Sequence, residues 1–331
     1  MRAAVLRRIA APGEPPLEIA EVAEPHPGPG YVAIRVEACG VCRTDLHIAE
    51  GEVAARLPIV PGHQAAGRVI ELGEGVEAPS IGQLVGVGWL ASTCGACVYC
   101  VSGRENLCAT ARFTGRDVDG GFAETMVVDP RFVFPLPESM SAVGAAPMLC
   151  AGIIGYRSLR LSGIQPGGRL GLFGFGASAH LAIQVALHWG CDVYAFTREA
   201  HHRQLALELG ATWTGEAPDD PGVPLDAAVL FAPAGELVPQ ILRRLDRGAT
   251  LAINAIHMSD VPPLAYDDLY WERTVRSVAN CTRQDAREFL ELAAEIPVRA
   301  GVERFSLDRV NGALARIRRG EVHGAAVIEM P

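Results

Sequence analysis

Residues 169–188, which read RLGLFGFGASAHLAIQVALH, decide the fold of this chain. The apolar run from Leu170 to Phe173 has the length of a buried strand, and a helical pattern of apolar residues follows from His180 to His188. Between them, the turn has the G-x-G-x-x-G/A form, in which the first glycine makes the turn and the second lets a pyrophosphate approach backbone N–H groups at the helix terminus. The stretch therefore predicts a dinucleotide-binding turn made of Gly174, Phe175, Gly176, Ala177, Ser178 and Ala179. The alternative is a glycine turn without a binding role, which the position between strand and helix disfavours.

Strand and helix patterns continue to alternate beyond this stretch. Such repeats imply right-handed crossovers and a parallel sheet. Further strands are expected at Val193–Phe196, Ala227–Phe231 and Ala249–Ile253, and helices at His201–Leu209 and Leu237–Leu245. We therefore expect a doubly wound Rossmann domain over residues 153–287.

The end of the second strand indicates which nicotinamide cofactor is bound. An acid at this place selects a free ribose 2′-hydroxyl, whereas an arginine accommodates a 2′-phosphate. Thr197 and Arg198 follow Phe196 here, and a small hydroxyl beside a guanidinium suits a phosphate dianion. We expect Thr197 and Arg198 to bind the cofactor, with NADP(H) favoured over NAD(H). The alternative is that Arg198 is solvated and both cofactors are accepted.

The flanking parts of the chain have a different texture. Residues 1 to about 140 are rich in Gly and Pro and hold short alternating runs such as Tyr31 to Val36, which are typical of half-buried strands. After the Rossmann segment, a helix is expected at Asp285–Glu295 and a strand near Ala325–Ile328. We expect residues 1–152 and 288–331 to form a second domain, mainly β.

Four cysteines are clustered in the first half of the chain. Their spacing, with two residues between consecutive thiols and then a longer gap, lets all four converge on one tetrahedral ion. Four protein ligands leave no open position, so the predicted zinc ion is structural. The ligands are Cys94, Cys97, Cys100 and Cys108. The alternative, disulfides or loose thiols, is disfavoured in a chain of nine cysteines without a visible export signal.

A resemblance groups further residues that spacing alone leaves scattered. The strings CGVCRTDLH, PGH, GVGWLASTCGACVYCVSGRENLC, TGRDVDGGFAE and PMLCAG occur in this order and resemble the zinc alcohol dehydrogenases of the medium-chain dehydrogenase/reductase family. The resemblance implies a GroES-like catalytic domain and a catalytic zinc on Cys42, His63 and Cys150, with a fourth position open to substrate. It thus implies two zinc ions per chain, and it leaves Cys39 as a spare thiol.

The same resemblance implies roles for the residues that follow Cys42. Thr44 would relay the alcohol proton and His47 would pass it outward, because imidazole suits proton transfer near pH 7. Asp45 would orient His63, and Arg43 would face the cofactor pyrophosphate. For each of these, the alternative is an ordinary polar surface residue.

Three other positions bear on the resemblance. Gln64 replaces the acid that usually follows the histidine ligand, which would leave the zinc more electrophilic and slow turnover. Ala325 stands where the family often has arginine, so one pyrophosphate contact would be missing. Trp89 matches an aromatic position of the substrate pocket, although packing explains a tryptophan there equally well.

Composition excludes several other classes of function. The formal charge of −9 and a pI near 5.5 argue against nucleic acid as a partner. No signal peptide or membrane-spanning run is visible, so we expect a soluble, cytoplasmic protein. The expected reaction is hydride transfer between a small alcohol, or its aldehyde or ketone, and the nicotinamide cofactor. The expected assembly is a homo-oligomer, either a tetramer or a dimer.

Two rival functions follow from the same residues. One is a zinc- and dinucleotide-binding redox sensor or scaffold without catalysis, which only Gln64 favours. The other is a zinc-free quinone reductase of the same superfamily, which conflicts with Cys42, His63 and Cys150.

Overall fold

The computed structural model describes residues 1–11, 14–296 and 298–331. The chain divides into two compact units. The first comprises Met1–Cys150, Asn280–Glu295 and Arg299–Pro331, and the second comprises Ala151–Ala279 and Ile296–Val298.

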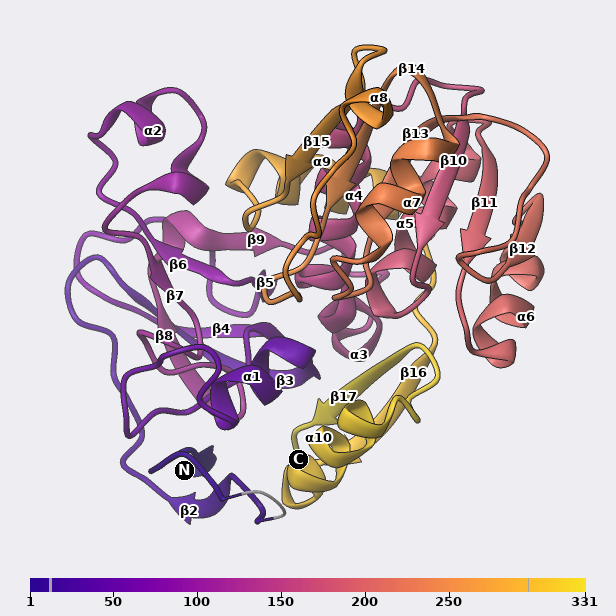
Figure 1. The fold of residues 1–331 in the computed structure, drawn as a ribbon. Coiled ribbons are helices and arrows are strands. Elements are labelled where there is room, and N and C mark those ends of the chain that lie inside the picture. Colours follow the sequence, from indigo (N-terminus) through magenta and orange to yellow (C-terminus); the bar gives the residue numbers. More distant parts are fainter. Residues whose placement is uncertain (12–13, 297) are drawn as a thin grey trace. The chain divides into compact units, whose positions relative to one another are not determined.

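The second unit is built on a six-stranded sheet in the order β12-β11-β10-β13-β14-β15, with parallel pairing of all neighbours (Figure 1). This is the strand order of a doubly wound Rossmann sheet, so the predicted fold class is confirmed. Phe173 and Phe196 stack with ring centroids 4.1 Å apart, and both are buried, as expected where helices cover a parallel sheet. The strands are β10 (Arg169–Phe173), β11 (Asp192–Phe196), β12 (Trp213–Gly215), β13 (Leu225–Leu230), β14 (Leu245–Ile253) and β15 (Thr274–Ser277).

The unit contains the helices α4 (Ala151–Ser162), α5 (Ala177–His188), α6 (Ala200–Leu209), α7 (Leu237–Arg244) and α8 (Tyr266–Leu269). Helices α5, α6 and α7 connect these strands at the predicted places, to within three residues, whereas α4 and α8 were not predicted. Helix α5 begins three residues earlier than predicted because its first turn follows directly on Gly176. Strands β12 and β15 were not predicted: one has three residues and the other is mostly exposed, so neither shows an apolar run.

The first unit is built on a seven-stranded sheet in the order β16-β17-β3-β4-β5-β9, with β8 also pairing with β3. Strands β4, β8 and β17 each run antiparallel to β3, so the carboxyl-terminal strand lies directly beside β3, and Ile328 pairs with Cys39. Leu6, Ile34, Phe122 and Met126 are among its fully buried core residues. The strands are β3 (Val32–Val41), β4 (Gln64–Leu72), β5 (Leu84–Val87), β8 (Thr125–Val128), β9 (Val133–Pro135), β16 (Val302–Ser306) and β17 (Ala325–Glu329).

Smaller elements complete the first unit. Two-stranded sheets are formed by β1 (Arg2–Val5) with β2 (Glu18–Glu21) and by β6 (Leu90–Ser92) with β7 (Arg112–Phe113). The helices are α1 (Arg43–Ala49), α2 (Val98–Val101), α3 (Ala142–Ala145), α9 (Arg283–Glu295) and α10 (Val310–Arg319), and 3-10 turns occur at Glu105–Leu107, Pro130–Phe132, Ala146–Leu149 and Leu307–Arg309. Among the described residues, no single helix is long and apolar enough to cross a membrane; one bent pair, Ala142–Leu149 with Ala151–Ser162, meets the criterion by length and composition.

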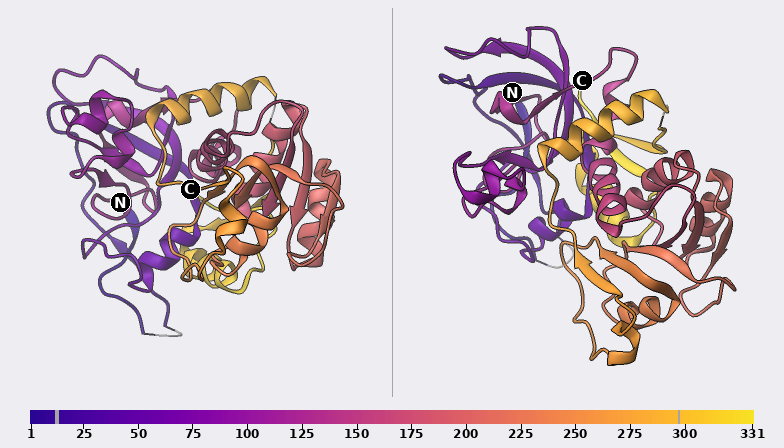
Figure 2. Two further views of the ribbon diagram at one scale, coloured as in Figure 1. Left: turned by 45° about the horizontal axis from the view of Figure 1, so that its top comes forward. Right: turned by 90° about the horizontal axis from the view of Figure 1, so that it is seen from above.

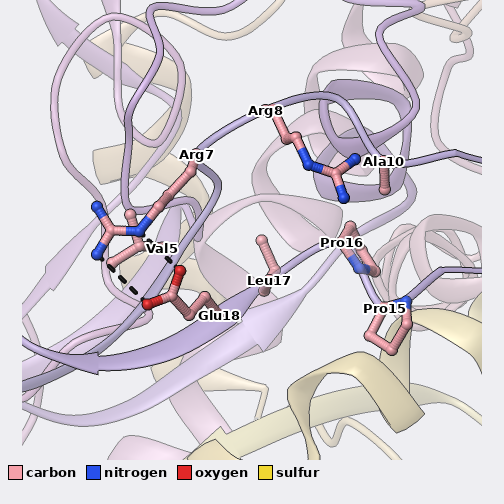
Figure 3. Close-up of a pocket in the computed structure, with 8 residues that line it drawn as sticks. All are labelled: Val5, Arg7, Arg8, Ala10, Pro15, Pro16, Leu17 and Glu18. Carbon is pink, nitrogen blue, oxygen red and sulfur yellow. Dashed lines mark hydrogen bonds and ion pairs between the residues drawn. The ribbon is translucent and has the colours of Figure 1, made fainter.

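A surface pocket of about 270 Å³ lies beside β1 and β2 (Figure 3). Its two arginines are engaged by carboxylates, because Arg7 bonds Glu18 at 2.7 Å and Arg8 bonds Glu14 at 3.0 Å. None of the residues predicted to bind zinc or cofactor lines it.

Candidate active site and metal centres

Cys42, His63 and Cys150 come from separate segments of the first unit and meet at one point. Cys42 caps the amino terminus of α1, His63 directly precedes β4, and Cys150 directly follows a 3-10 turn. Their sulfur and nitrogen ligand atoms all lie within 4.8 Å of one another, and Nε2 of His63 is 3.3 Å from Sγ of Cys150. The structure thus brings together the three residues that the resemblance grouped.

Asp45 fixes this triad from behind. Its Oδ1 lies 3.0 Å from Nδ1 of His63 and also accepts the Gly62 N–H, while its Oδ2 accepts the Cys42 N–H at 2.8 Å. The side chains of Asp45 and His63 are each 1% exposed. Because the carboxylate accepts a hydrogen bond from Nδ1–H, Nε2 is left to face the two sulfur atoms. Asp45 therefore holds the imidazole in the orientation that a metal ligand needs.

Contacts within the triad, and with Asp45, shift the pKa values of its side chains. A hydrogen bond from Cys150 lowers the pKa of the Cys42 thiol well below its usual value despite burial, and the same bond together with burial raises the pKa of Cys150. Burial opposes a charged His63, but Asp45 and Cys42 outweigh it and raise the pKa of His63 to about 10. A cation that binds all three must displace protons, so its affinity rises with pH.

Helix α1 presents the other predicted residues near Cys42. The Thr44 N–H donates to Cys42 Sγ at 3.5 Å, and the Thr44 hydroxyl oxygen lies 3.6 Å from the same sulfur. His47 is one turn further along, so it lies on the same helix face as Thr44, and its ring contacts Glu52. Arg43 is exposed and donates to the Ile317 carbonyl at 3.2 Å.

Trp89 is buried against the triad, and Gln64 is buried beside Gly40. Trp89 packs its ring edge-on against His63, with centroids 4.9 Å apart, and stacks on Phe113. Gln64 is 3% exposed and lies against Gly40, where an added Cβ would be 2.9 Å from the amide group. Trp89 therefore forms part of the wall around the triad, whereas Gln64 fills the space beside Gly40.

The four clustered cysteines also converge. Sγ of Cys97 lies 3.5 Å from that of Cys100, and Sγ of Cys108 lies 3.6 Å from that of Cys94, with all four within 4.8 Å of one another. These separations far exceed an S–S bond of about 2.05 Å. Gly95 has a φ of +72°, which allows the tight turn after Cys94. Four thiols at this spacing match a closed tetrahedral zinc site.

A buried carboxylate attaches the four-cysteine segment to helix α9. Oε1 of Glu105 accepts both the backbone N–H of Arg283 at 3.0 Å and its Nε at 3.1 Å. Glu105 is 4% exposed, and Figure 2 shows α9 starting beside this segment. Sequence reasoning missed the pair because its members are 178 residues apart.

The glycine turn of the second unit has the predicted geometry. Gly174 has a φ of +89°, and an added Cβ would lie 2.8 Å from the Ala232 nitrogen, so only glycine fits there. Gly176 caps α5 with open space where its Cβ would point. Ala177, Ser178 and Ala179 form the first helical turn, whose free N–H groups suit a phosphate.

The end of β11 holds an acid that sequence reasoning overlooked. Thr197 is buried, and its hydroxyl donates to Oε2 of Glu199 at 3.0 Å. Burial raises the pKa of Glu199, but its hydrogen bonds and the charges of His202 and Arg198 outweigh this and lower it. The side chain of Arg198 is 87% exposed, with a guanidinium nitrogen 3.7 Å from the Glu199 carboxylate. The Glu199 carboxylate and the Arg198 guanidinium therefore lie next to each other just after β11.

Comparison with known proteins places the chain in a family. Residues 28–138 match the alcohol dehydrogenase GroES-like domain. The chain is 48% identical to a protein of Mycobacterium tuberculosis described as a probable alcohol dehydrogenase, AdhA, over 95% of this chain and 92% of the relative.

Solved structures agree over the whole chain. A cinnamyl alcohol dehydrogenase of Sorghum bicolor superposes with a TM-score of 0.91 at 29% identity, over 99% of this chain and 97% of that one. A protein of Sinorhizobium meliloti 1021 is described as a zinc-binding dehydrogenase and is bound to NADP. It superposes with a TM-score of 0.88 at 27% identity, over 99% of this chain and 98% of that one. Taken with the GroES-like and Rossmann folds, these likenesses show that the chain is an oxidoreductase and belongs to the alcohol dehydrogenases of the medium-chain dehydrogenase/reductase family.

Proposed function

We propose that this alcohol dehydrogenase depends on zinc, with a catalytic ion on Cys42, His63 and Cys150. The observation that carries the proposal is the convergence of two thiols and one imidazole whose far nitrogen is held by Asp45. Two cysteines and one histidine suit zinc, and three protein ligands leave one position for the substrate. Cys42 and Cys150 are partly exposed, so solvent reaches this side of the set.

When bound, the zinc ion supplies Lewis acidity toward the alcohol oxygen, and the nicotinamide supplies the hydride acceptor. The chain's own part is to bind, orient and move a proton. Thr44 is 8% exposed beside Cys42 and accepts the alcohol proton as it passes its own on. His47, on the same face of α1, receives that proton. Trp89 walls the site against water.

A second zinc ion, held by Cys94, Cys97, Cys100 and Cys108, is proposed as structural. The segment around these thiols has little apolar core, since Val98 and Val101 are more than 60% exposed. A metal ion is a usual way to order such a segment.

We further propose NADP(H) as the favoured cofactor. Gly174, Gly176, Ala177, Ser178 and Ala179 would bind the pyrophosphate, and Arg43 would reach it from α1. The side chain of Arg198 is 87% exposed and its pair with Glu199 is 3.7 Å long, so it can turn toward a 2′-phosphate. The NADP-bound dehydrogenase of Sinorhizobium meliloti, which shares the fold, agrees with this choice. Glu199 is the feature that favours NAD(H).

Catalysis is proposed for residues 1–152 with 288–331, and cofactor binding for residues 153–287. The expected substrates are small alcohols and aldehydes.

Assembly as a tetramer or dimer stays a prediction, which native mass spectrometry tests. A non-catalytic sensor or scaffold is not favoured, because the chain keeps the whole triad and its relatives are alcohol dehydrogenases.

The test is zinc content by elemental analysis, with oxidation of benzyl alcohol by NADP and by NAD. Wild type should bind about two zinc ions per chain, and Cys42→Ala about one, with loss of turnover. Cys39→Ala, which removes a buried thiol three residues away, is the matched control and should keep both ions. Zinc content and turnover that do not depend on Cys42 would refute the proposal.

A further inference from the structure

Glu199 caps the start of helix α6, and its two carboxylate oxygens face different neighbours. Oε2 accepts a hydrogen bond from the Thr197 hydroxyl at 3.0 Å and lies 3.6 Å from Nδ1 of His202, in the first turn of the helix. Oε1 lies 3.7 Å from a guanidinium nitrogen of Arg198. The carboxylate therefore has an imidazole, whose charge depends on pH, on one side and a permanent cation on the other.

The imidazole is the member of this group that changes charge near neutral pH. The side chain of His202 is 17% exposed, so it exchanges protons with solvent. Imidazole titrates between about pH 5 and 8. Burial raises the pKa of Glu199, but its hydrogen bonds and the charges of His202 and Arg198 outweigh this and lower it. Over this pH range the carboxylate therefore stays ionised, whereas the ring gains a positive charge on acidification.

Arg203 and Glu216 are the charged groups nearest to this turn on the side of β12. The guanidinium of Arg203 donates to the carbonyls of Thr197 and Arg198, at 2.7 Å each, and lies 3.5 Å from the Glu216 carboxylate. Arg203 thus holds the backbone from which the Arg198 side chain extends. Neither Arg203 nor Glu216 changes charge between about pH 5.5 and 8.

Two other histidines lie near His202. His201 contacts it ring to ring, with centroids 4.2 Å apart, and is exposed. His180 comes from α5, which packs against α6, and is 2% exposed. Burial lowers the pKa of His180 to about 4, so this ring stays neutral near pH 7. His201 is therefore the neighbouring group that titrates in the same range and needs a control.

We propose that His202 is a positioning residue that makes the cofactor preference depend on pH. When protonated, its ring pairs with Glu199, offsets the negative charge of the carboxylate and leaves Arg198 to the 2′-phosphate of NADP(H). When neutral, it leaves the carboxylate to accept the ribose 2′-hydroxyl of NAD(H). Acidification should therefore move the preference toward NADP(H). This rests on the cofactor binding proposed above for the end of β11.

The measurement is the ratio of the Kd of NAD⁺ to the Kd of NADP⁺, from calorimetric titration of the zinc-loaded protein between about pH 5.5 and 8. The 2′-phosphate takes up its own second proton near about pH 6, which weakens NADP⁺ binding in every variant alike. Each wild-type ratio is therefore divided by that of His202→Gln at the same pH. This quotient should rise about threefold to fivefold on acidification, the size of a partly exposed charge interaction.

Three variants isolate the charge on His202. His202→Gln carries no charge and should keep the cofactor preference of the neutral ring. His202→Lys is charged over the whole range and should keep the preference of the protonated ring. His201→Gln, which removes the adjacent imidazole, is the matched control and should retain the wild-type pH dependence. Equal ratios for wild type and His202→Gln at every pH, or loss of the dependence in His201→Gln, would overturn the proposal.

A second comparison tests whether His202 acts through the carboxylate. In the Glu199→Gln background, adding His202→Gln should leave the ratio unchanged at every pH, because the group that His202 positions is gone. A pH-dependent difference that persists between these two proteins would mean that His202 acts on the phosphate directly, and would overturn its positioning role.

The proposed function and this inference fail by different outcomes. Tighter binding of NAD⁺ than of NADP⁺ at every pH would refute the proposed preference, but the change of the ratio with pH would still report on His202. Failure of wild type to bind either cofactor would refute the binding proposed for residues 153–287, and this inference with it.

Discussion

Asp45 and His63 form a buried hydrogen bond of 3.0 Å, in which one carboxylate oxygen faces Nδ1 while the other accepts the backbone N–H of Cys42. A single side chain thus orients one proposed zinc ligand and caps the helix that begins beside another. Such partners of a ligating histidine raise its basicity and set its tautomer.

Asp45→Asn should weaken zinc binding at the triad by about 10- to 100-fold, because an amide carries no charge and can turn its NH2 group, instead of its oxygen, toward Nδ1 of His63. Competition with a chromophoric chelator measures the affinity. Asp285→Asn is the matched control, since Asp285 is equally buried and accepts from Thr282 in a similar helix cap at α9. Equal losses of zinc affinity in the two variants would show that the loss comes from a weakened helix cap and not from a misoriented zinc ligand.

Cys97→Ser should remove the proposed structural zinc ion and leave the proposed catalytic one. Zinc content should fall from about two to about one per chain, and the melting temperature should fall with it, because the metal orders a segment with little core. Elemental analysis and calorimetry measure these. Cys191→Ser is the control, because Cys191 is buried in the second unit and hydroxyl keeps its bond to the Gln165 carbonyl. Retention of both ions in Cys97→Ser would contradict the four-thiol site.

Glu105→Gln should destabilise the chain near pH 7 by about 1–3 kcal/mol, because it weakens two charge-assisted bonds to Arg283. Burial raises the pKa of Glu105, but the Arg283 bonds outweigh it and lower the pKa. This stabilisation is therefore present above the ordinary glutamate pKa of about 4.3 and is lost as the pH falls through the lower, folded-state value.

Urea unfolding of wild type and Glu105→Gln over this pH range tests whether the stabilisation by Glu105 is lost as the pH falls. The difference between them should shrink as the pH falls. Glu138→Gln, which removes an exposed partner of Arg68, should have no measurable effect at any pH. A constant difference for Glu105→Gln would mean that shape, not charge, accounts for the loss.

Local signals in the sequence were sufficient for much of the fold. The run Leu170 to Phe173 and the glycines at 174 and 176 are contiguous, so strand, turn and helix could be predicted together. Strand β15 could not, because Thr274–Ser277 pairs at a sheet edge where side chains are mostly exposed and no apolar pattern is required.

Only part of the candidate site could be predicted from local sequence signals. The four-cysteine cluster is local, but Cys42, His63 and Cys150 are brought together only by tertiary folding, so their grouping depended on resemblance. Contacts that depend on a reversal of the backbone could not be predicted from the sequence. Glu52 contacts the His47 ring only because the backbone reverses at Gly51, which has a φ of +80°.

Arg198 and Glu199, whose charged groups are 3.7 Å apart, are the residues that we propose set the cofactor preference, with opposite effects. Arg198→Ala should weaken NADPH binding by about 10- to 100-fold, the loss of one charge-assisted hydrogen bond, and leave NADH binding nearly unchanged. Glu199→Gln should strengthen NADPH binding, because it removes a negative charge beside the 2′-phosphate, and should weaken NADH binding. Fluorescence titration of both cofactors measures affinity without turnover. Arg243→Ala, an exposed arginine of the same unit paired with Asp268, is the control for net charge. If Arg198→Ala binds NADPH as tightly as wild type, the preference for NADP(H) does not reside at this end of β11.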